Sequence, residues 1–262
     1  MNSARRLYED LSVIAVSKTP APGITYSRVE TEKDLFGCIN QLNNYVQQNG
    51  VLPLIHIDAH GCKDGIQLAN NSQLSWSRLI DVLVPLNTTM KLNLMLILAS
   101  CHGGTFAKAI SITDRAPVWG LIGPTQALTA GQVEDDFGAF YKTFFYTLST
   151  SKALEVLNRK VPKNVYFRTT VEDFFYEVWK GYKKNYCSPD KLKERANKMY
   201  KLTERQQGIS LLNTEQFKQL LKSQDRNVFN NFRDTYFMCD LFPNHKERFG
   251  VTYDKAEVRV AR

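Results

Sequence analysis

The chain has 262 residues, of which 43% are hydrophobic and 23% are charged, a balance typical of a globular protein with one large domain or a domain and an extension. No apolar run reaches the roughly 18 residues of a membrane-spanning helix. The start, MNSARRLYEDLSVIAVSK, lacks the apolar core of a signal peptide. We therefore expect no membrane span and a cytoplasmic location.

The cysteines agree with that location. Five are scattered along the chain without a Cys-x-x-Cys pair, at positions 38, 62, 101, 187 and 239. Neither a disulfide framework nor a zinc knuckle is indicated, so reduced thiols are expected.

The net charge of +8 is unevenly distributed. Residues 159–206 contain thirteen Lys or Arg and six Asp or Glu, a local excess of seven positive charges. Such a segment could attract nucleic acid or an acidic partner. It could equally be the solvated face of a helical region, because no groove-reading motif accompanies the basic residues.

Apolar runs alternate with amphipathic stretches through the first half of the chain, which predicts a βαβ succession. The expected strands cover residues 11–17, 52–59, 92–100 and 118–123. The expected helices cover residues 33–50, 76–86, 104–110 and 134–159. We expect Gly50 to end the first of these helices in the left-handed conformation, and Pro85 to stop the second.

The pattern changes after about residue 160. One more strand is expected over residues 166–170, then helices over 171–184, 189–206 and 214–238, and last an edge strand over 256–262. The sequence therefore predicts an α/β fold: a three-layer α/β/α sandwich with a mostly parallel central sheet in residues 1–160, and a mainly helical extension in residues 161–262.

Two of the expected strands end in reactive residues. LIHIDA is followed by His60-Gly61, and LMLILAS is followed by Cys101. Reactive groups of an open parallel sheet gather beyond the carboxyl ends of its strands. The 41 residues from His60 to Cys101 leave room for one crossover helix between neighbouring parallel strands. We therefore expect the imidazole and the thiol to face one crevice.

The pairing predicts nucleophilic catalysis. Cys101 precedes a Gly-Gly turn and an expected helix, whose N-terminus would favour the thiolate. His60 could carry the thiol proton to a leaving amine. The backbone N–H groups of Gly61 and Cys101 would form an oxyanion hole, since a glycine lets the substrate carbonyl approach closely.

At these residues the sequence resembles the caspase-like (clan CD) cysteine peptidases, which include caspases, metacaspases, separase and bacterial CHAT domains. LIHIDAHG and LMLILASCHGG match the strands that carry the histidine and the nucleophile in that family. GIQLANNSQLSWSRL and the stretch from VWGLIG to ALEVLN look like the segments that follow them in CHAT domains, so the resemblance covers about residues 10 to 160. It implies a caspase-like fold and a cysteine endopeptidase that acts on a protein substrate without a cofactor. It also implies activation by a partner or upstream signal, in a defence or cell-death system such as antiviral defence.

The resemblance has one clear departure. Metacaspases have an acidic residue two positions before the nucleophile, where this chain has Ala99. A preference for basic substrate residues is therefore not expected, although Asp58 or Asp64 could supply the charge. Ala99 and the loop around Thr125 and Gln126 are expected to line the substrate pocket.

The histidines and acids near the dyad admit other roles. Asp58 could support the site through hydrogen bonds, while His56 is expected to bond within the fold and His102 to shape the turn or pocket. The DAH triplet also resembles the arginase and agmatinase metal motif, Asp-Ala-His-x-Asp, but Cys62 replaces its last acid. A binuclear metal hydrolase thus remains one alternative to a metal-free peptidase. A non-catalytic caspase-like interaction module is another.

Overall fold

The structure is a computed structural model that describes residues 3–18, 21–160 and 165–260. The chain forms two compact units. Unit 1 comprises residues 1–110 and 117–170, and unit 2 comprises residues 111–116 and 171–262. No helix in the described part of the chain is long and apolar enough to cross a membrane.

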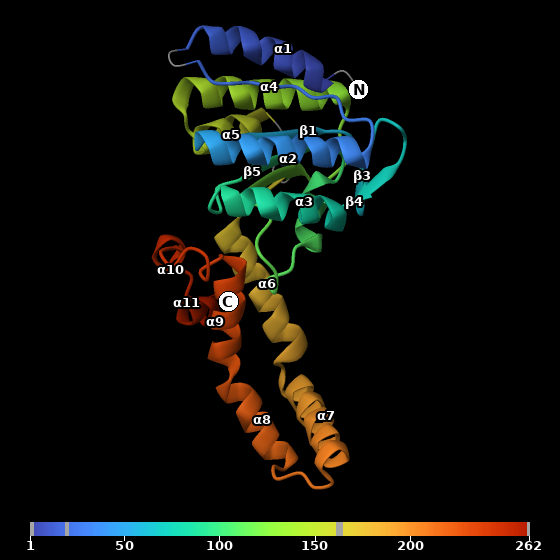
Figure 1. Ribbon diagram of the computed structural model, residues 1–262, viewed down its shortest axis with the longest axis vertical. Coiled ribbons are helices and arrows are strands. Elements are labelled where there is room, and N and C mark those ends of the chain that lie inside the picture. Colours follow the sequence, from blue (N-terminus) through green and yellow to red (C-terminus); the bar gives the residue numbers. More distant parts are fainter. Residues whose placement is uncertain (1–2, 19–20, 161–164, 261–262) are drawn as a thin grey trace. The chain divides into compact units, whose positions relative to one another are not determined.

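Unit 1 is built around a four-stranded sheet (Figure 1). Its strands, in spatial order, are β1 (Leu54–Asp58), β5 (Met95–Ala99), β6 (Gly120–Pro124) and β7 (Tyr166–Thr170). The first three run parallel and β7 is antiparallel to β6, so the predicted mostly parallel sheet is confirmed. A second, antiparallel sheet contains β2 (His60–Gly61), β3 (Gly65–Gln67) and β4 (Gln73–Ser75).

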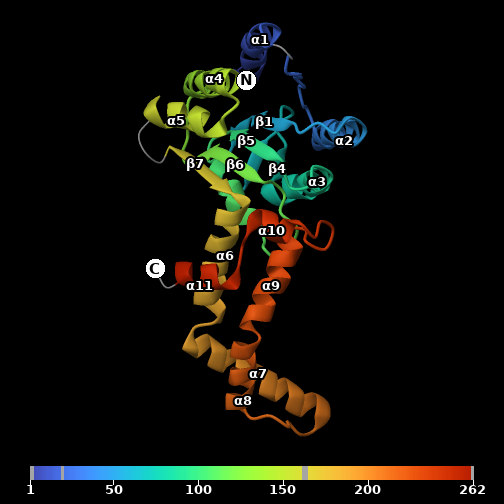
Figure 2. The ribbon, with the colours of Figure 1, turned by 90° about the vertical axis from the view of Figure 1, so that its left-hand side faces the viewer.

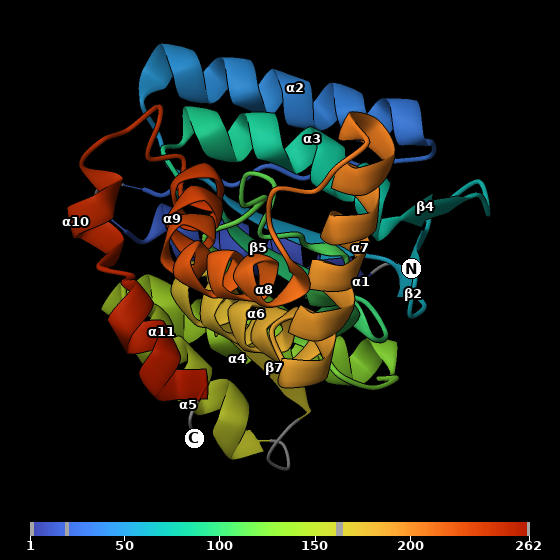
Figure 3. The ribbon, with the colours of Figure 1, turned by 90° about the horizontal axis from the view of Figure 1, so that it is seen from below.

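Helices lie on both faces of the four-stranded sheet (Figure 2). One face carries α1 (Ser3–Val16), α4 (Ala130–Thr147) and α5 (Thr150–Lys160), which share a core with Ile97, Ala99 and Ile122 of the sheet. Leu96 and Leu98 alternate with these residues and point to the other face, where α2 (Glu32–Asn49) and α3 (Trp76–Thr89) lie side by side (Figures 1 and 3). The seven residues after the β5 turn form a 3-10 helix, η1 (Gly103–Ala109).

The prediction for residues 11–17 is wrong, because they are the end of α1 and not a strand. Leu7, Leu11 and Ala15 are buried at four-residue spacing, while Val13 and Val16 are exposed. The apolar face thus has the helical period. The seven residues LSVIAVS span only about two turns, so this period cannot be recognised from them alone.

Three expected helices of unit 1 differ in detail. Residues 134–159 are not one helix: α4 and α5 are separated at Leu148, which caps α4 in the left-handed conformation with φ of 50°. Pro85 lies inside α3, which continues to Thr89. The stretch after the Gly-Gly pair is 3-10 rather than α-helical. By contrast, Gly50 ends α2 with φ of 63°, as predicted.

Unit 2 is helical (Figures 1 and 2). Its helices are α6 (Val171–Tyr186), α7 (Pro189–Gln207), α8 (Thr214–Ser223), α9 (Asp225–Tyr236), α10 (His245–Phe249) and α11 (Tyr253–Val260). The helix expected over 214–238 is divided at Gln224, and the strand expected over 256–262 is wrong because α11 occupies residues up to 260. The core of unit 2 is rich in aromatic side chains. Trp179 and Phe175 both pack edge-on against Phe229, with ring centroids 5.0 Å and 5.4 Å from it, respectively.

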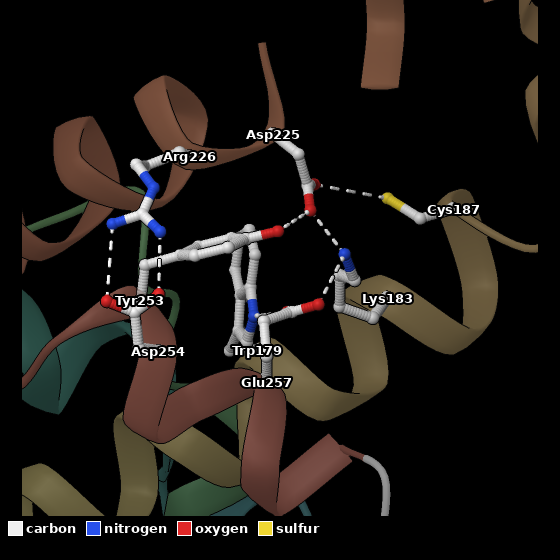
Figure 4. Close-up of polar contacts among 8 residues, drawn as sticks. All are labelled: Trp179, Lys183, Cys187, Asp225, Arg226, Tyr253, Asp254 and Glu257. Carbon is white, nitrogen blue, oxygen red and sulfur yellow. Dashed lines mark hydrogen bonds and ion pairs between the residues drawn. The ribbon is translucent and has the colours of Figure 1, made fainter. Parts of the chain in front are cut away.

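A shielded ion cluster joins three helices of unit 2 (Figure 4). Lys183 of α6 pairs with Asp225 of α9 and with Glu257 of α11. The Tyr253 hydroxyl donates to Asp225 at 2.7 Å. Burial alone would lower the pKa of Lys183, but the two carboxylates raise it above its usual range.

Residues 111–116 join this unit from within the sequence of unit 1. The Ala116 N–H donates to the Tyr236 carbonyl at 3.1 Å. Arg115 forms a two-bond ion pair with Asp240, with its shorter bond at 2.6 Å.

Candidate active site

The carboxyl ends of β1 and β5 meet, as predicted. The two strands are parallel neighbours, with Asp58 opposite Ala99. Shortly after each strand the chain reaches a reactive residue, His60 after β1 and Cys101 after β5. A Cβ placed on Gly61 would lie 2.3 Å from the Cys101 carbonyl oxygen and 2.9 Å from the Ser100 Cβ. The segment that carries His60 is therefore in direct contact with the one that carries Cys101, and this approach requires a glycine at position 61.

Cys101 lies at the corner of a tight turn. The Gly103 N–H donates to the Ser100 carbonyl at 2.9 Å, which closes the turn around Cys101 and His102. His102 has φ of 59° and ψ of 20°, a left-handed conformation that costs a side-chain-bearing residue about 1 kcal/mol or more. Cys101 is half-buried and His60 is exposed, so both residues are in part accessible to solvent.

The Gly61 N–H is directed away from the second sheet. Cys62 donates its N–H to the Gly65 carbonyl at 2.9 Å, so these residues form a hydrogen-bonded pair of the β2–β3 hairpin. Hydrogen-bonded and non-hydrogen-bonded pairs alternate along antiparallel strands. The next pair, Gly61 with Ile66, is therefore non-hydrogen-bonded, which leaves the Gly61 N–H on the side of β2 that faces away from β3.

A loop between β6 and α4 lies against the turn. The Cys101 thiol donates to the Leu128 carbonyl, with 3.7 Å between Sγ and oxygen. His102 donates its backbone N–H to the Gln126 carbonyl and its ring Nδ1–H to the Thr125 carbonyl, both at 3.3 Å. Thr125 is itself held by the Val165 carbonyl at 2.8 Å. The expected pocket residues Thr125 and Gln126 thus adjoin the turn through their backbone.

The third expected pocket residue, Ala99, is only 1% exposed. It belongs to the core that the sheet shares with α4, next to Val133 and Phe137. Its side chain therefore lies between the sheet and α4 and is not on the surface.

Asp58 and His56 point into the fold, where hydrogen bonds hold them, as expected for His56. Ser3 of α1 donates its hydroxyl to Asp58 Oδ2 at 2.5 Å, and burial raises the pKa of this carboxyl. His56 Nδ1 lies 3.0 Å from the Tyr141 hydroxyl, and its ring packs edge-on against Phe137. Burial lowers the pKa of His56 to about 4.

This arrangement separates the residues of the metal motif. Asp58 is bonded to α1 and His56 to α4, whereas His60 stands on β2 with its side chain exposed. Within residues 3–18, 21–160 and 165–260, no group of three or more His, Cys, Asp or Glu side chains is placed to hold a metal ion. The donor set of a binuclear hydrolase is thus not gathered among the described residues.

Two contacts of the site were not predicted from the sequence. The Leu128 carbonyl faces the thiol, but a backbone contact of this kind leaves no trace in residue type. Ser3 reaches Asp58 from 55 positions earlier in the chain, and no local pattern connects the two.

Comparisons with protein families and with curated proteins found no match to this chain. The resemblance to caspase-like peptidases therefore stays a prediction from the motifs.

Proposed function

We propose that this protein is a caspase-like cysteine endopeptidase, with Cys101 as nucleophile and His60 as proton carrier. The observation that carries the proposal is the contact of Gly61 with Ser100 and Cys101 where two parallel strands end. This contact brings a histidine-bearing and a thiol-bearing segment to one edge of a rigid sheet. A caspase-like three-layer domain and a cytoplasmic location belong to the same proposal.

The chemistry follows from these groups. The Cys101 sulfur attacks the scissile carbonyl carbon, and the carbonyl electron pair moves onto oxygen, where the N–H groups of Gly61 and Cys101 donate hydrogen bonds. His60 takes the thiol proton and delivers it to the leaving amine as the C–N bond breaks. Water then attacks the thioester, His60 removes its proton, and the acid product leaves as Cys101 regains its hydrogen.

The thiol in this structure donates to Leu128 and not to an imidazole. Release of that contact, by a shift of the loop over residues 125–129, would free the sulfur for His60. We therefore propose activation by a regulatory protein partner that moves this loop, consistent with a role in a defence or cell-death system.

The nucleophile is tested by replacing single cysteines. Cys101→Ala should remove peptidase activity, while Cys62→Ala, an exposed thiol one residue beyond Gly61, should retain it. Activity is measured on the activated protein, and thermal unfolding checks that each variant is folded. A thiol-directed inhibitor should abolish cleavage and a chelator should leave it unchanged.

Cleavage by the folded Cys101 variant would refute the mechanism. Inhibition by the chelator alone would favour the metal hydrolase. If neither the wild type nor the variants cleave under any activating condition, the result would favour a non-catalytic interaction module.

Specificity should not be strongly basic. Asp58 bonds to Ser3 inside the fold and is not available to a substrate side chain. Asp64 is exposed and is the remaining nearby acid that was considered. A buried, unpaired Lys or Arg of the substrate would cost several kcal/mol.

A peptide-library screen of the activated enzyme measures this preference. We expect no predominance of Arg or Lys before the cleaved bond and no change in Asp64→Asn. Predominant cleavage after basic residues that Asp64→Asn removes would show that Asp64 supplies the charge we excluded.

A further inference from the structure

The α7–α8 hairpin of unit 2 exposes aliphatic side chains at its tip, which we define as residues 198–222. The two helices lie side by side and are joined by residues 208–213 (Figures 1 and 2). The exposed side chains are Leu202 (55%), Ile209 (72%), Leu211 (88%) and Leu220 (40%). Single exposed aliphatics are ordinary, but a group of this kind at one tip marks an interaction site.

These four side chains are not part of the buried core of the hairpin. Its buried residues are Leu192, Ala196 and Phe217. Ile209 and Leu211 lie in the loop that connects the two helices, and most of each side chain is exposed. They are thus available to enter an apolar phase outside the protein.

All four exposed side chains lie near the same end of the hairpin. Leu202 precedes the last residue of α7 by five positions, and Leu220 follows the first residue of α8 by six. At 1.5 Å per residue, both lie within roughly 9 Å of the helix ends that form the tip. This spread along the hairpin is similar to the roughly 5–10 Å that the apolar side chains of interfacial helices enter at the boundary between headgroups and acyl chains.

The charge of the tip is also complementary to such an interface. Residues 198–222 contain five basic residues and two acids, Glu204 and Glu215. Lys201, Arg205 and Lys222 form no ion pair with any described residue, whereas Lys198 and Lys218 pair with Glu194 and Glu215. The unpaired cations would meet lipid phosphates near the surface. Nucleic acid is a poorer fit, because it binds through phosphates and aromatic stacking and would leave the exposed aliphatics in water.

We propose that this tip docks on an anionic phospholipid surface. The four aliphatic side chains enter the interface, and Lys201, Arg205 and Lys222 contact the headgroups. Docking would hold the protein at a membrane surface through this tip. The inference is independent of the peptidase proposal, so the Cys101→Ala protein should bind as the wild type does.

Co-sedimentation of the full-length protein with vesicles tests the proposal. Binding is expected to vesicles of equal parts phosphatidylcholine and phosphatidylserine, and to weaken as salt is raised, but not to phosphatidylcholine alone. Replacing Ile209 and Leu211 together by Ser should lower binding by at least about tenfold. The variant loses most of the apolar surface that these two side chains would bury in the lipid.

Two matched controls separate the tip from general stickiness. Leu241→Ser with Val258→Ser makes the same change at exposed aliphatics elsewhere in unit 2 and should leave binding unchanged. Lys201→Gln with Arg205→Gln should weaken binding more than Lys180→Gln with Lys193→Gln, which removes equal charge away from the tip. Thermal unfolding confirms that each variant is folded.

Three outcomes would overturn the proposal. The first is that the protein does not bind anionic vesicles at low salt. The second is that the variant with Ser at positions 209 and 211 binds vesicles as well as the wild type does. The third is that the tip substitutions weaken binding to a single-stranded oligonucleotide or an acidic peptide but not to vesicles. The last would assign the tip to nucleic acid or to a protein partner.

Discussion

Gly61 occupies a position that has no room for a side chain. The nearest atoms to its missing Cβ include the Cys101 carbonyl oxygen at 2.3 Å, a backbone atom that cannot rotate away. A methyl group there would push apart the two strand ends that carry His60 and Cys101. The sequence predicted a role for Gly61, because a glycine directly after the histidine suits the expected oxyanion hole. The steric requirement for glycine is seen only in the folded structure.

Gly61→Ala should therefore both destabilise the protein and impair cleavage. We expect a loss of roughly 2–3 kcal/mol in the free energy of unfolding, the scale of an overpacked contact that forces the backbone to move. Gly37→Ala is the control, since Gly37 lies in α2 with open space around it and alanine should add about 0.5–1 kcal/mol. Denaturant midpoints measure both changes, and an unchanged midpoint for Gly61→Ala would contradict the close contact.

Other residue-level roles could be predicted only in part. The order and spacing of His60 and Cys101 sufficed to place them at neighbouring strand ends. The partners of Asp58 and His56 come from α1 and α4, 55 and 85 positions away in sequence. Contacts at that separation depend on tertiary packing, which no local pattern encodes.

Among the elements, the strands of the four-stranded sheet were predicted most reliably. The expected strand over residues 92–100 contains β5, whose apolar run suits a strand with neighbours on both sides. The strands expected over residues 52–59 and 166–170 contain the edge strands β1 and β7. Residues 11–17 and 256–262 were misassigned because each is short enough to suit either period. Their helical identity depends on buried residues such as Leu7 and Ala256 within longer helices.

The break between α4 and α5 was also missed, because Leu148 is an unusual residue for a left-handed helix end. Its φ of 50° would normally select glycine, and its side chain is 81% exposed, so packing contributes little. Leu148→Gly should raise the free energy of unfolding by about 1 kcal/mol.

Thermal or chemical unfolding of the Leu148 variants measures this gain. Leu148→Ala is the control: it removes the same exposed side chain but keeps a Cβ, so it should not reproduce the increase. Equal stabilities of the glycine and alanine variants would show that the left-handed cap carries no strain.

At the scale of the whole molecule, each unit contains a histidine whose pKa is lowered by burial. His56 lies in unit 1 and His245 in unit 2. An unfolded histidine has a pKa near 6.5, so between that pH and the lower folded pKa the unfolded chain binds more protons. The free energy of unfolding should therefore fall as the pH is lowered.

For His56 the window runs from about pH 6.5 to about 4, where its folded pKa lies. The full loss should approach roughly 3 kcal/mol, at about 1.4 kcal/mol per pKa unit. Denaturant unfolding at pH 7 and pH 4.5 measures the change, and His56→Gln should show a smaller one. An equal loss in that variant would mean that other groups cause the acid sensitivity.

The contribution of residues 111–116 to unit 2 has a genetic consequence. The chain passes between the units after residues 110, 116 and 170, so unit 2 is not one continuous stretch. A gene fragment for residues 171–262 alone would omit Arg115 and Ala116, and with them the bonds to Asp240 and Tyr236. Exchange of residues 171–262 for another domain would likewise leave Arg115 and Ala116 without Asp240 and Tyr236. A gene segment that is to encode the whole of unit 2 must therefore include residues 111–116 as well as 171–262.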